Sequence, residues 1–339
     1  MGKNKKSVYY IKEDKSTVQD YYVWIIKEAF RRLGYDDIVD IEKSNIKSIS
    51  KESIIIAISH YCAFELYLKG FRNIVYWVQG SSPDESFMRN HSYIRKTIIS
   101  FIEHFALKHS KCVFMVSNSL IEHFKKKYNK DYSYKTYIMP CFNETINESL
   151  FYTDEKYDNN VFCYVGGLSV WQNFPETVDI FKQVQAKQPD AVLKVYTPDQ
   201  EKAKAIIDEK GINNYSIGFV KSSELSNELA SCKFGFIVRS ESPVNRVATP
   251  TKLSNYMSAG VIPVVSNTVG FFDEVLRDKK YSVLLNGDTK KDIDAILDIC
   301  KKTIDPKDVF SEYKEIFDKY YNPELHTKQI SAFLSRYWK

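Results

Sequence analysis

The sequence lacks the features that would assign it to several specialised classes of protein. No apolar run approaches the roughly 18 residues of a membrane-spanning helix, and the 339 residues contain no internal repeat or low-complexity tract. None of the six cysteines belongs to a CxxC pair, and most lie within apolar runs, so we expect reduced core thiols without disulfides or a metal site. The N-terminal residues MGKNKKSVYY are basic but have no apolar h-region, so we expect a cytoplasmic protein.

The length and composition indicate a folded protein of two domains. A chain of 339 residues exceeds one ordinary core and suits two domains of about 150 to 170 residues. Its hydrophobic content of 44% and aromatic content of 14% are typical of well-packed globular proteins. The net charge of +5, from 48 basic and 43 acidic residues, permits attraction to phosphate groups but is too mild and too spread for a nucleic-acid binder. We therefore expect no nucleic-acid partner.

Short apolar runs that suit buried parallel strands alternate with amphipathic segments in both halves of the chain. In the first half we expect strands at residues 7–11, 37–41, 53–58, 73–78, 112–116 and 137–139, and helices at 19–33, 63–69, 94–109 and 117–124. In the second half we expect strands at 161–165, 192–196, 215–218, 234–238, 261–265 and 283–285, and helices at 175–185, 200–210, 222–229, 252–259, from 273, at 290–302 and at 323–337. This alternation predicts two doubly wound α/β domains.

A polar stretch between the two series of strands, NETINESLFYTDEKYDNN, is the expected linker. We place an N-terminal domain at residues 1–150, a second domain at 151–322, and a C-terminal helix that packs back towards the N-terminal domain at 323–339. Ligands of doubly wound sheets bind outside the carboxyl ends of the strands, so the ligand is expected in a cleft between the two domains.

The most informative stretch is FGFIVRSESPVNRVATPTKLSNYMSAGVIPVVSN, residues 234–267. An apolar strand ends at Arg239, a polar loop follows, and Thr251 opens a helix with Lys252 in its first turn and Gly260 at its end. A first-turn lysine does not stabilise the helix dipole, but free backbone N–H groups beside a lysine bind anions well. We predict a site for a phosphorylated ligand, against the alternative that Arg239 and Lys252 are a solvated surface pair.

Three segments resemble glycosyltransferases of the GT-B architecture, in particular the retaining family 4 type (glycosyl transferases group 1) of bacterial surface-polysaccharide biosynthesis. They are PTKLSNYMSAGVIPVV, FCYVGGLSVWQNFPETVDIF and, more weakly, FIEHFALKHSKCVFMVSNSLIEHF. The resemblance implies two Rossmann-like doubly wound domains that face each other across a cleft. It also implies transfer of a sugar from a nucleotide diphosphate sugar, with a UDP-sugar as the expected donor, to a glycan or lipid-linked glycan of the cell surface (capsule, O-antigen or similar). Retention of configuration and independence of metal are expected.

The resemblance also assigns roles to residues of the second domain. Lys252 would contact the diphosphate, with Arg239 as a second phosphate contact, and both are expected to take part in catalysis by stabilising the leaving group. The other donor-side residues that the resemblance implies are Gly166, Gly167, Tyr196, Thr197, Phe219, Thr251 and Asn255. The two glycines would let the backbone approach the phosphates, whereas Tyr196, Thr197 and Phe219 would hold the base.

The chain departs from the family pattern at several of these positions. Asn255 stands where an acidic residue usually bonds the ribose, Val247 replaces its partner glutamate, and Gln172 replaces a lysine. An amide still hydrogen-bonds a sugar hydroxyl, but without charge assistance. Glu241 is an alternative acidic residue nearby. These departures keep two other hypotheses open: a catalytically weakened scaffold or binding subunit, and another GT-B enzyme such as an epimerase.

The first domain offers candidates for the acceptor side. His60, expected at a strand tip, is the candidate for catalytic contact with the sugar or acceptor, and a purely structural histidine is the alternative. Asp84 and Glu85 are acid–base candidates, or caps of a loop, in the segment SSPDES. Trp77 and Gln79 are candidates for an acceptor platform, with a core role as the alternative for Trp77. No DxD motif of metal-dependent transferases occurs, so no metal requirement is expected.

The segment KKKYNKDYSYKTY, Lys125 to Tyr137, interleaves basic and aromatic residues. One interpretation is a solvated loop. The other is a contact with an anionic membrane surface, at the inner face of the plasma membrane, because lysines attract anionic headgroups and tyrosines favour the interface.

Overall fold

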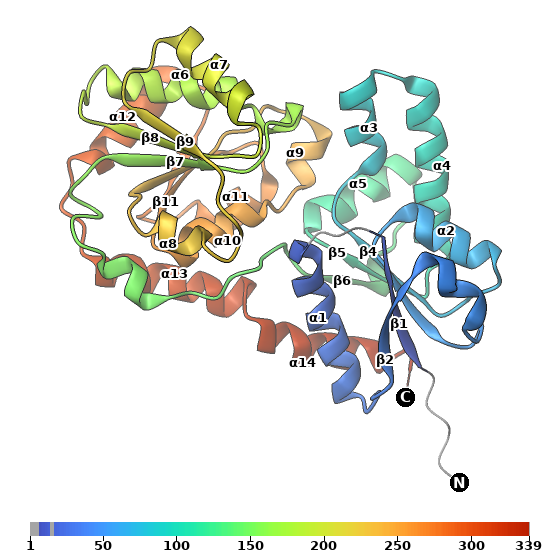
Figure 1. The fold of residues 1–339 in the computed structure, drawn as a ribbon. Helices are drawn as coiled ribbons and strands as arrows, with labels where there is room; N and C mark the ends of the chain where they lie inside the picture. Colours follow the sequence, from blue (N-terminus) through green and yellow to red (C-terminus); the bar gives the residue numbers. More distant parts are fainter. Residues whose placement is uncertain (1–6, 14–16, 339) are drawn as a thin grey trace. The chain divides into compact units, whose positions relative to one another are not determined.

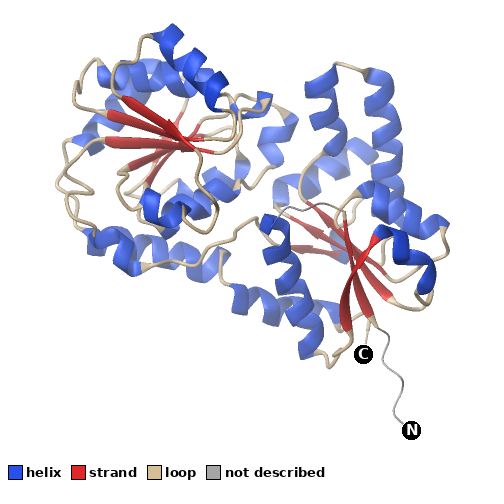
Figure 2. Ribbon diagram, viewed as in Figure 1, coloured by secondary structure: helices blue, strands red, loops and turns tan. Residues whose placement is uncertain are grey.

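The computed structural model describes residues 7–13 and 17–338, except for the side chains of residues 17 and 18. The chain forms two compact units, one of Met1–Asn143 with Asn322–Lys339 and the other of Glu144–Tyr321. The sequence-based boundaries were 150/151 and 322/323. Each unit contains one parallel sheet with helices on both of its faces (Figures 1 and 2).

The sheet of the first unit has the strand order β2-β1-β3-β4-β5-β6, and every pairing is parallel. Its strands are β1 (Val8–Lys12), β2 (Ile38–Glu42), β3 (Ile54–Ala57), β4 (Ile74–Val78), β5 (Cys112–Met115) and β6 (Thr136–Ile138). Its helices are α1 (Thr17–Arg32), α2 (His60–Leu68), α3 (Ser82–Asn90), α4 (Tyr93–His109), α5 (Asn118–Tyr128) and α14 (Pro323–Leu334), with 3-10 turns η1 (Lys43–Ser48) and η2 (Ser133–Lys135). The order reverses between β1 and β3, where ligands of such sheets usually bind.

The C-terminal helix α14 belongs to this first unit and packs against α1. Arg32 of α1 forms an ion pair with Glu324 of α14, and the ring of Phe30 lies 5.7 Å from that of Trp338. A hydrogen bond of 2.9 Å joins the Tyr137 hydroxyl to His326. Residues from the two ends of the chain therefore complete one core.

The sheet of the second unit has the strand order β9-β8-β7-β10-β11-β12, again fully parallel. Its strands are β7 (Val161–Val165), β8 (Val192–Tyr196), β9 (Tyr215–Gly218), β10 (Phe234–Ile237), β11 (Ile262–Ser266) and β12 (Val283–Leu285). Its helices are α6 (Phe174–Gln185), α7 (Gln200–Lys210), α8 (Leu225–Leu229), α9 (Pro243–Val247), α10 (Thr251–Ser258), α11 (Gly270–Leu276), α12 (Thr289–Cys300) and α13 (Pro306–Tyr320), with 3-10 turns η3 (Glu148–Tyr152) and η4 (Val170–Gln172). Here the order reverses between β7 and β10.

The residue types explain the central strands of both sheets. Ile54–Ala57 and Phe234–Ile237 are buried at every position, as expected for parallel strands covered by helices on two faces. The predicted α/β class with two doubly wound sheets is thereby confirmed. Three helices were not expected: α3 in the segment SSPDES, α9 in the loop after Arg239, and α13. Both of the first two have a Ser-Pro pair at their start, within α3 at Ser82-Pro83 and across the N-cap of α9 at Ser242-Pro243, and this pair suits a turn as well as the first turn of a helix.

One buried tyrosine holds the second sheet open at its point of reversal. Strands β7 and β10 pair only at Phe162 with Phe234 and at Cys163 with Gly235. Beyond these pairs, the Tyr256 hydroxyl of α10 accepts from the Val165 N–H and donates to the Phe236 carbonyl, both at 3.2 Å. A side chain thus replaces the next backbone hydrogen bond of the ladder, so the two strands separate where a ligand site is expected.

Glycine at position 235 is required by this arrangement. A Cβ atom there would lie 2.6 Å from Cδ2 of the Tyr256 ring. We expect Gly235→Ala to lower the free energy of unfolding by about 1–3 kcal/mol, the usual effect of overpacking, in a urea titration. Gly218→Ala, in strand β9 of the same sheet, is the control because no atom lies within 4 Å of the added methyl group. Equal stability of the two variants would contradict this account.

Candidate functional site

The predicted phosphate-site residues of the second unit gather at the carboxyl edge of its sheet, where the strand order reverses. Strand β7 ends at Val165 and is followed by Gly166 and Gly167, whereas β10 ends at Ile237 and is followed within two residues by Arg239. Helix α10 contributes Lys252 from its first turn. The structure therefore brings together the glycines and both cations that the sequence predicted.

Arg239 is only 7% exposed, so its guanidinium lies inside the edge of the sheet. Its backbone N–H donates to Ser266 Oγ at 2.8 Å, and its Nη1 donates to the Trp171 carbonyl at 2.7 Å. Its Nε is buried and has no hydrogen-bond partner among the described residues. Burial lowers the pKa of Arg239 to about 10, so it stays charged at neutral pH.

Lys252 is similarly enclosed, with 9% of its surface exposed. Its Nζ donates to Gln172 Oε1 at 2.7 Å and lies 4.1 Å from the centroid of the Tyr164 ring. Burial, and then the charge of Arg239, lower the pKa of Lys252 well below its usual value. The guanidinium of Arg239 and the amine of Lys252 thus each donate to a neutral oxygen of adjacent residues in turn η4, and in the described part of the chain neither forms an ion pair with a carboxylate.

The glycines after β7 keep space beside these cations. Gly166 has a φ of 110°, and a Cβ atom there would lie 3.0 Å from Lys252 Cε. A Cβ atom at Gly167 would lie 3.4 Å from Asp199 Oδ2, the oxygen that accepts the Leu168 N–H at 2.8 Å. The backbone conformation at Gly166 is one that other residues rarely adopt.

The residues predicted to hold a base lie at the ends of the neighbouring strands β8 and β9, at the same edge: Tyr196 ends β8, Thr197 follows it, and Phe219 follows β9. Thr197 is buried, and its hydroxyl accepts from the Asp199 N–H at 3.1 Å. The Tyr196 hydroxyl donates to Glu228 at 3.1 Å, and burial is the main reason that its pKa is raised. Phe219 exposes 61% of its surface, which leaves an aromatic face open to a ligand.

Helix α10 holds the two remaining predicted donor-side residues. Thr251 lies half-buried in its first turn, and Asn255 is buried one turn later. Val247 is also buried, whereas Glu241 lies at the surface and pairs with Arg246 at 2.6 Å. Glu241 is therefore held by a neighbouring base on the surface.

A cavity of about 160 Å³ adjoins Arg239 and reveals residues that the sequence did not single out. Its lining includes Ser266, Thr268 and Asn173, the last with a φ of 47° at the start of α6. Ser266 ends strand β11, so a search for polar residues at strand ends would have found it. No sequence signal marked Thr268, because its role depends on a contact of 3.2 Å with the Arg239 carbonyl.

The predicted acceptor-side residues of the first unit are less accessible. His60 begins α2, is 7% exposed and has a buried Nε2 without a hydrogen-bond partner among the described residues. Burial, with a smaller effect of the Lys127 charge, lowers its pKa to about 4. Trp77 has no exposed surface and packs edge-on against Tyr22 at 4.8 Å, which favours its role as a core anchor. Gln79 is half-buried just after β4.

Asp84 lies in a buried polar cluster that joins α3 to α4 and α5. Its carboxylate accepts from Ser81, pairs with Lys96 at 2.7 Å and lies 3.1 Å from His123 Nε2. Burial raises the pKa of Asp84, but hydrogen bonds from His123, Lys96 and Ser81 outweigh it and hold the pKa well below its usual range. The protein thus occupies these oxygens with its own donors.

Glu85, beside this cluster, is half-buried, and burial raises its pKa. Its nearest ion-pair partner is Arg89 at 3.7 Å. Of the two predicted acids, Glu85 is therefore the better candidate for proton transfer.

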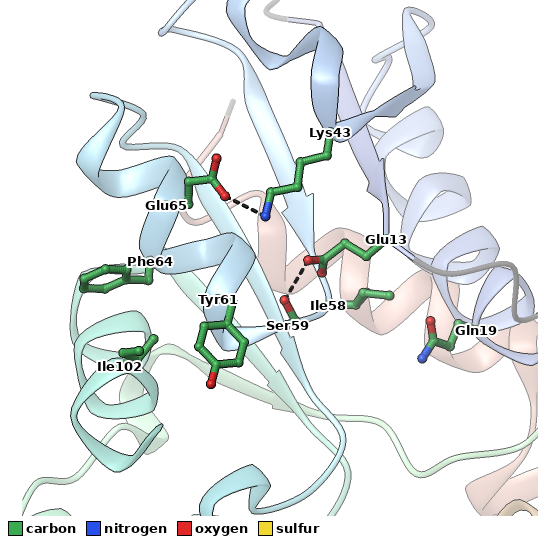
Figure 3. Close-up of a pocket in the computed structure, with 9 residues that line it drawn as sticks. All are labelled: Glu13, Gln19, Lys43, Ile58, Ser59, Tyr61, Phe64, Glu65 and Ile102. Atoms are coloured by element: carbon green, nitrogen blue, oxygen red, sulfur yellow. Dashed lines mark hydrogen bonds and ion pairs between the residues drawn. The ribbon is translucent and has the colours of Figure 1, made fainter. Parts of the chain in front are cut away.

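A second cavity, of about 710 Å³, lies in the first unit beside the carboxyl ends of β1 and β3, where the strand order reverses (Figure 3). It is lined by Glu13, Gln19, Lys43, Ile58, Ser59, Tyr61, Phe64, Glu65 and Ile102. Ser59 donates to Glu13 at 2.9 Å, and Lys43 pairs with Glu65 at 2.6 Å. None of these residues was predicted, although Ser59 and Tyr61 flank His60 in the sequence.

The segment from Lys125 to Tyr137 is not a continuous solvated loop. Helix α5 continues to Tyr128, and η2 and β6 follow. Lys127 turns inward to Glu103 at 3.3 Å, and the buried Lys135 donates to the carbonyls of Lys108 and Ser110 at 3.0 and 2.8 Å. Two of the lysines expected at the surface therefore serve the core.

The residues that the structure describes offer neither a metal-binding cluster nor a membrane-spanning helix. No group of three or more His, Cys, Asp or Glu residues is placed to hold a metal ion there. Within the same residues, every helix is too short or too polar to cross a membrane.

A family model described as Glycosyl transferases group 1 matches residues 146–315. Among solved structures, sucrose-phosphate synthase from Thermosynechococcus elongatus superposes with a TM-score of 0.72 at 13% identity, over 98% of this chain and 99% of that one. HepE from Anabaena in complex with UDP gives 0.72 at 13%, over 97% and 100%. A TarM mutant from S. aureus, in complex with fondaparinux, alpha-GlcNAc-glycerol and UDP, gives 0.64 at 12%, over 86% of this chain and 57% of that one. The curated proteins gave no match. These similarities confirm the predicted GT-B fold.

The pKa of His60 makes a prediction about stability and pH. Its folded value of about 4 lies below the ordinary 6.5, so the unfolded chain binds the proton more tightly. The contribution of neutral His60 to the free energy of unfolding is fully present above pH 6.5. As the pH falls towards 4 this contribution is lost, and the loss is roughly 2 kcal/mol at pH 4.5. In urea titrations from pH 7 to 4.5, we expect His60→Gln to reduce the loss of stability by this amount. His91→Asn, at an exposed site, should behave like the wild type. Parallel pH profiles for wild type and His60→Gln would refute the prediction.

Proposed function

The chain belongs to the glycosyl transferases group 1 family and is a glycosyltransferase with the GT-B fold, and we propose that its donor is a UDP-sugar bound at Arg239 and Lys252. The observation that carries this proposal is a pair of buried cations resting on neutral oxygens at the carboxyl edge of β7 and β10. UDP is named because two of the similar structures, HepE and TarM, are complexes with UDP.

The two cations suit a leaving nucleoside diphosphate. Their desolvation has already occurred in the folded chain, so little reorganisation is needed when phosphate oxygens replace the Trp171 carbonyl and the Gln172 amide oxygen. The unpartnered Arg239 Nε adds a further donor. As the bond between the sugar and the diphosphate breaks, negative charge grows on the phosphate, and both cations stabilise it. Catalysis by Arg239 and Lys252 is therefore electrostatic.

The other parts of the donor are proposed to bind around Arg239 and Lys252. Gly166 and Gly167 leave room for the phosphates, while Phe219, Tyr196 and Thr197 contribute the aromatic and polar surface for the base. Asn255 and Thr251 of α10 are proposed to bind the ribose. We propose retention of configuration, with the departing phosphate accepting the proton of the acceptor hydroxyl, and no metal requirement because the cations neutralise the diphosphate.

The acceptor is proposed to be a glycan or lipid-linked glycan of cell-surface polysaccharide synthesis. The cavity of about 710 Å³ in the first unit suits a saccharide, since Tyr61 and Phe64 offer ring faces and Glu13 and Ser59 offer hydrogen bonds. His60 and Glu85 remain the candidates for proton transfer to or from the acceptor. A cytoplasmic enzyme at the membrane periphery would meet such an acceptor.

A weakened scaffold or binding subunit is the second candidate function. It is favoured by Gln172 and the buried Val247, which remove a positive charge and a carboxylate from the family pattern. Release of UDP from a panel of UDP-sugars supports the enzyme. Stabilisation by UDP without any such release supports the subunit.

Lys252→Ala and Arg239→Ala test the proposed donor site. Each removes one charge-assisted contact with phosphate, so we expect about tenfold or more weaker UDP binding and a comparable loss of turnover. Calorimetric titration with UDP measures the affinity, and the melting temperature without ligand monitors folding. Lys204→Ala, an exposed lysine on α7 of the same unit, should bind as the wild type does. Unchanged affinity in both site variants would exclude this site.

A further inference from the structure

Helix α4 carries an apolar face that the fold does not use. Ile94, Ile98 and Phe101 are 76%, 55% and 65% exposed, and their spacing places them in one line with Phe105 along the helix. The opposite face is buried through Ile99, Glu103, Ala106 and Leu107. A surface helix usually has one apolar stripe, directed at the core. The outward stripe of α4 is therefore unexplained by folding.

The apolar face continues onto α2, which packs beside α4. The Phe105 ring lies 4.9 Å from Phe64 and 5.2 Å from Tyr67. Leu68, at the end of α2, is 65% exposed. We call the surface formed by Ile94, Ile98, Phe101, Phe105, Phe64 and Leu68 the α2–α4 face. A continuous apolar surface of this kind marks an interaction site more often than scattered exposed residues do.

The acidic side chains of these two helices are buried or paired with lysines, so the charged side chains available to a binding partner are basic. The only acid of α4, Glu103, is fully buried, and the acid of α2, Glu65, is paired with Lys43 and Lys69. Arg95 and Lys108, by contrast, are exposed on α4, on either side of the apolar line.

We propose that the α2–α4 face docks on an anionic lipid bilayer surface, with the apolar line in the interface and Arg95 and Lys108 at the headgroups. A surface-lying helix with apolar residues on one side and bases at its edges has this mode of binding. A second copy of the chain fits the face less well, because a two-fold pairing would bring the same bases together without acids to neutralise them.

The proposed docking also bears on the substrate. Phe64 belongs to the α2–α4 face and lines the cavity of about 710 Å³ as well, together with Tyr61 and Ile102. If that cavity receives the acceptor, which rests on the function proposed above, the acceptor is an amphiphile with its saccharide in the cavity and its hydrocarbon in the bilayer. The docking itself does not depend on that function.

Vesicle co-sedimentation of the full chain tests the proposal. With vesicles of equal parts phosphatidylcholine and phosphatidylglycerol, we expect binding that weakens with added salt and is nearly absent on pure phosphatidylcholine. The double variant Ile98→Ser, Phe101→Ser should bind about tenfold or more weakly, because it removes two large exposed side chains from the interface. Both positions are exposed, so folding and UDP binding should be unchanged, which separates this test from the donor-site test.

Tyr134→Ser serves as the matched control. Tyr134 is 69% exposed and lies in the segment from Lys125 to Tyr137, the other candidate for membrane contact. We expect it to bind vesicles as the wild type does. The proposal is overturned if the wild type does not bind anionic vesicles, or if the double variant binds equally well. It is also overturned if Tyr134→Ser alone loses binding, or if the double variant converts a dimer to a monomer in size-exclusion chromatography.

Discussion

The carboxyl edge of the second sheet depends on two basic side chains, Arg239 and Lys252, that are buried without a carboxylate among the described residues. Removing a cation from water is unfavourable unless a partner replaces the lost hydration. Among the described residues, the side chains of Arg239 and Lys252 donate to a carbonyl and an amide oxygen, both from turn η4, and the Tyr164 ring lies 4.1 Å from Lys252 Nζ. Neither oxygen carries a full charge, so a bound anion would stabilise both side chains further. Gln172 accepts from Lys252 without adding a third positive charge beside Arg239 and Lys252.

The strands were the most predictable part of the fold, because buried parallel strands consist of short apolar runs. The predicted bounds of β7, β8, β9 and β12 match the structure residue for residue. The position of Arg239 beyond a strand end was also predictable. Its burial was not, since the sequence left a solvated surface pair as the alternative for Arg239 and Lys252. The enclosing oxygens come from residues 68 and 80 positions away in the sequence, and local patterns do not register such contacts.

The first unit shows the same limit more strongly. In this unit, residues near strand ends were predicted as functional because of their side-chain chemistry. A side chain near a strand end, however, can point either into the core or towards solvent. Trp77 lies in the core and Asp84 in a cluster with Lys96 and His123. The larger cavity instead uses Ser59 and Tyr61, the neighbours of His60. The lining thus includes both sequence neighbours of His60, whereas the direction of each side chain depends on helix packing.

Tyr256 links the geometry of the second sheet to the chemistry at its edge. The residue lies one turn after Lys252 on α10, and its hydroxyl holds apart the two strands between which the site forms. The width of the opening and the location of the lysine are thus properties of a single eight-residue helix. A substitution that altered one would alter the other. At the proposed donor site, accommodation of a bulkier donor would therefore fall to the loops after β8 and β9 and not to a wider opening between the strands.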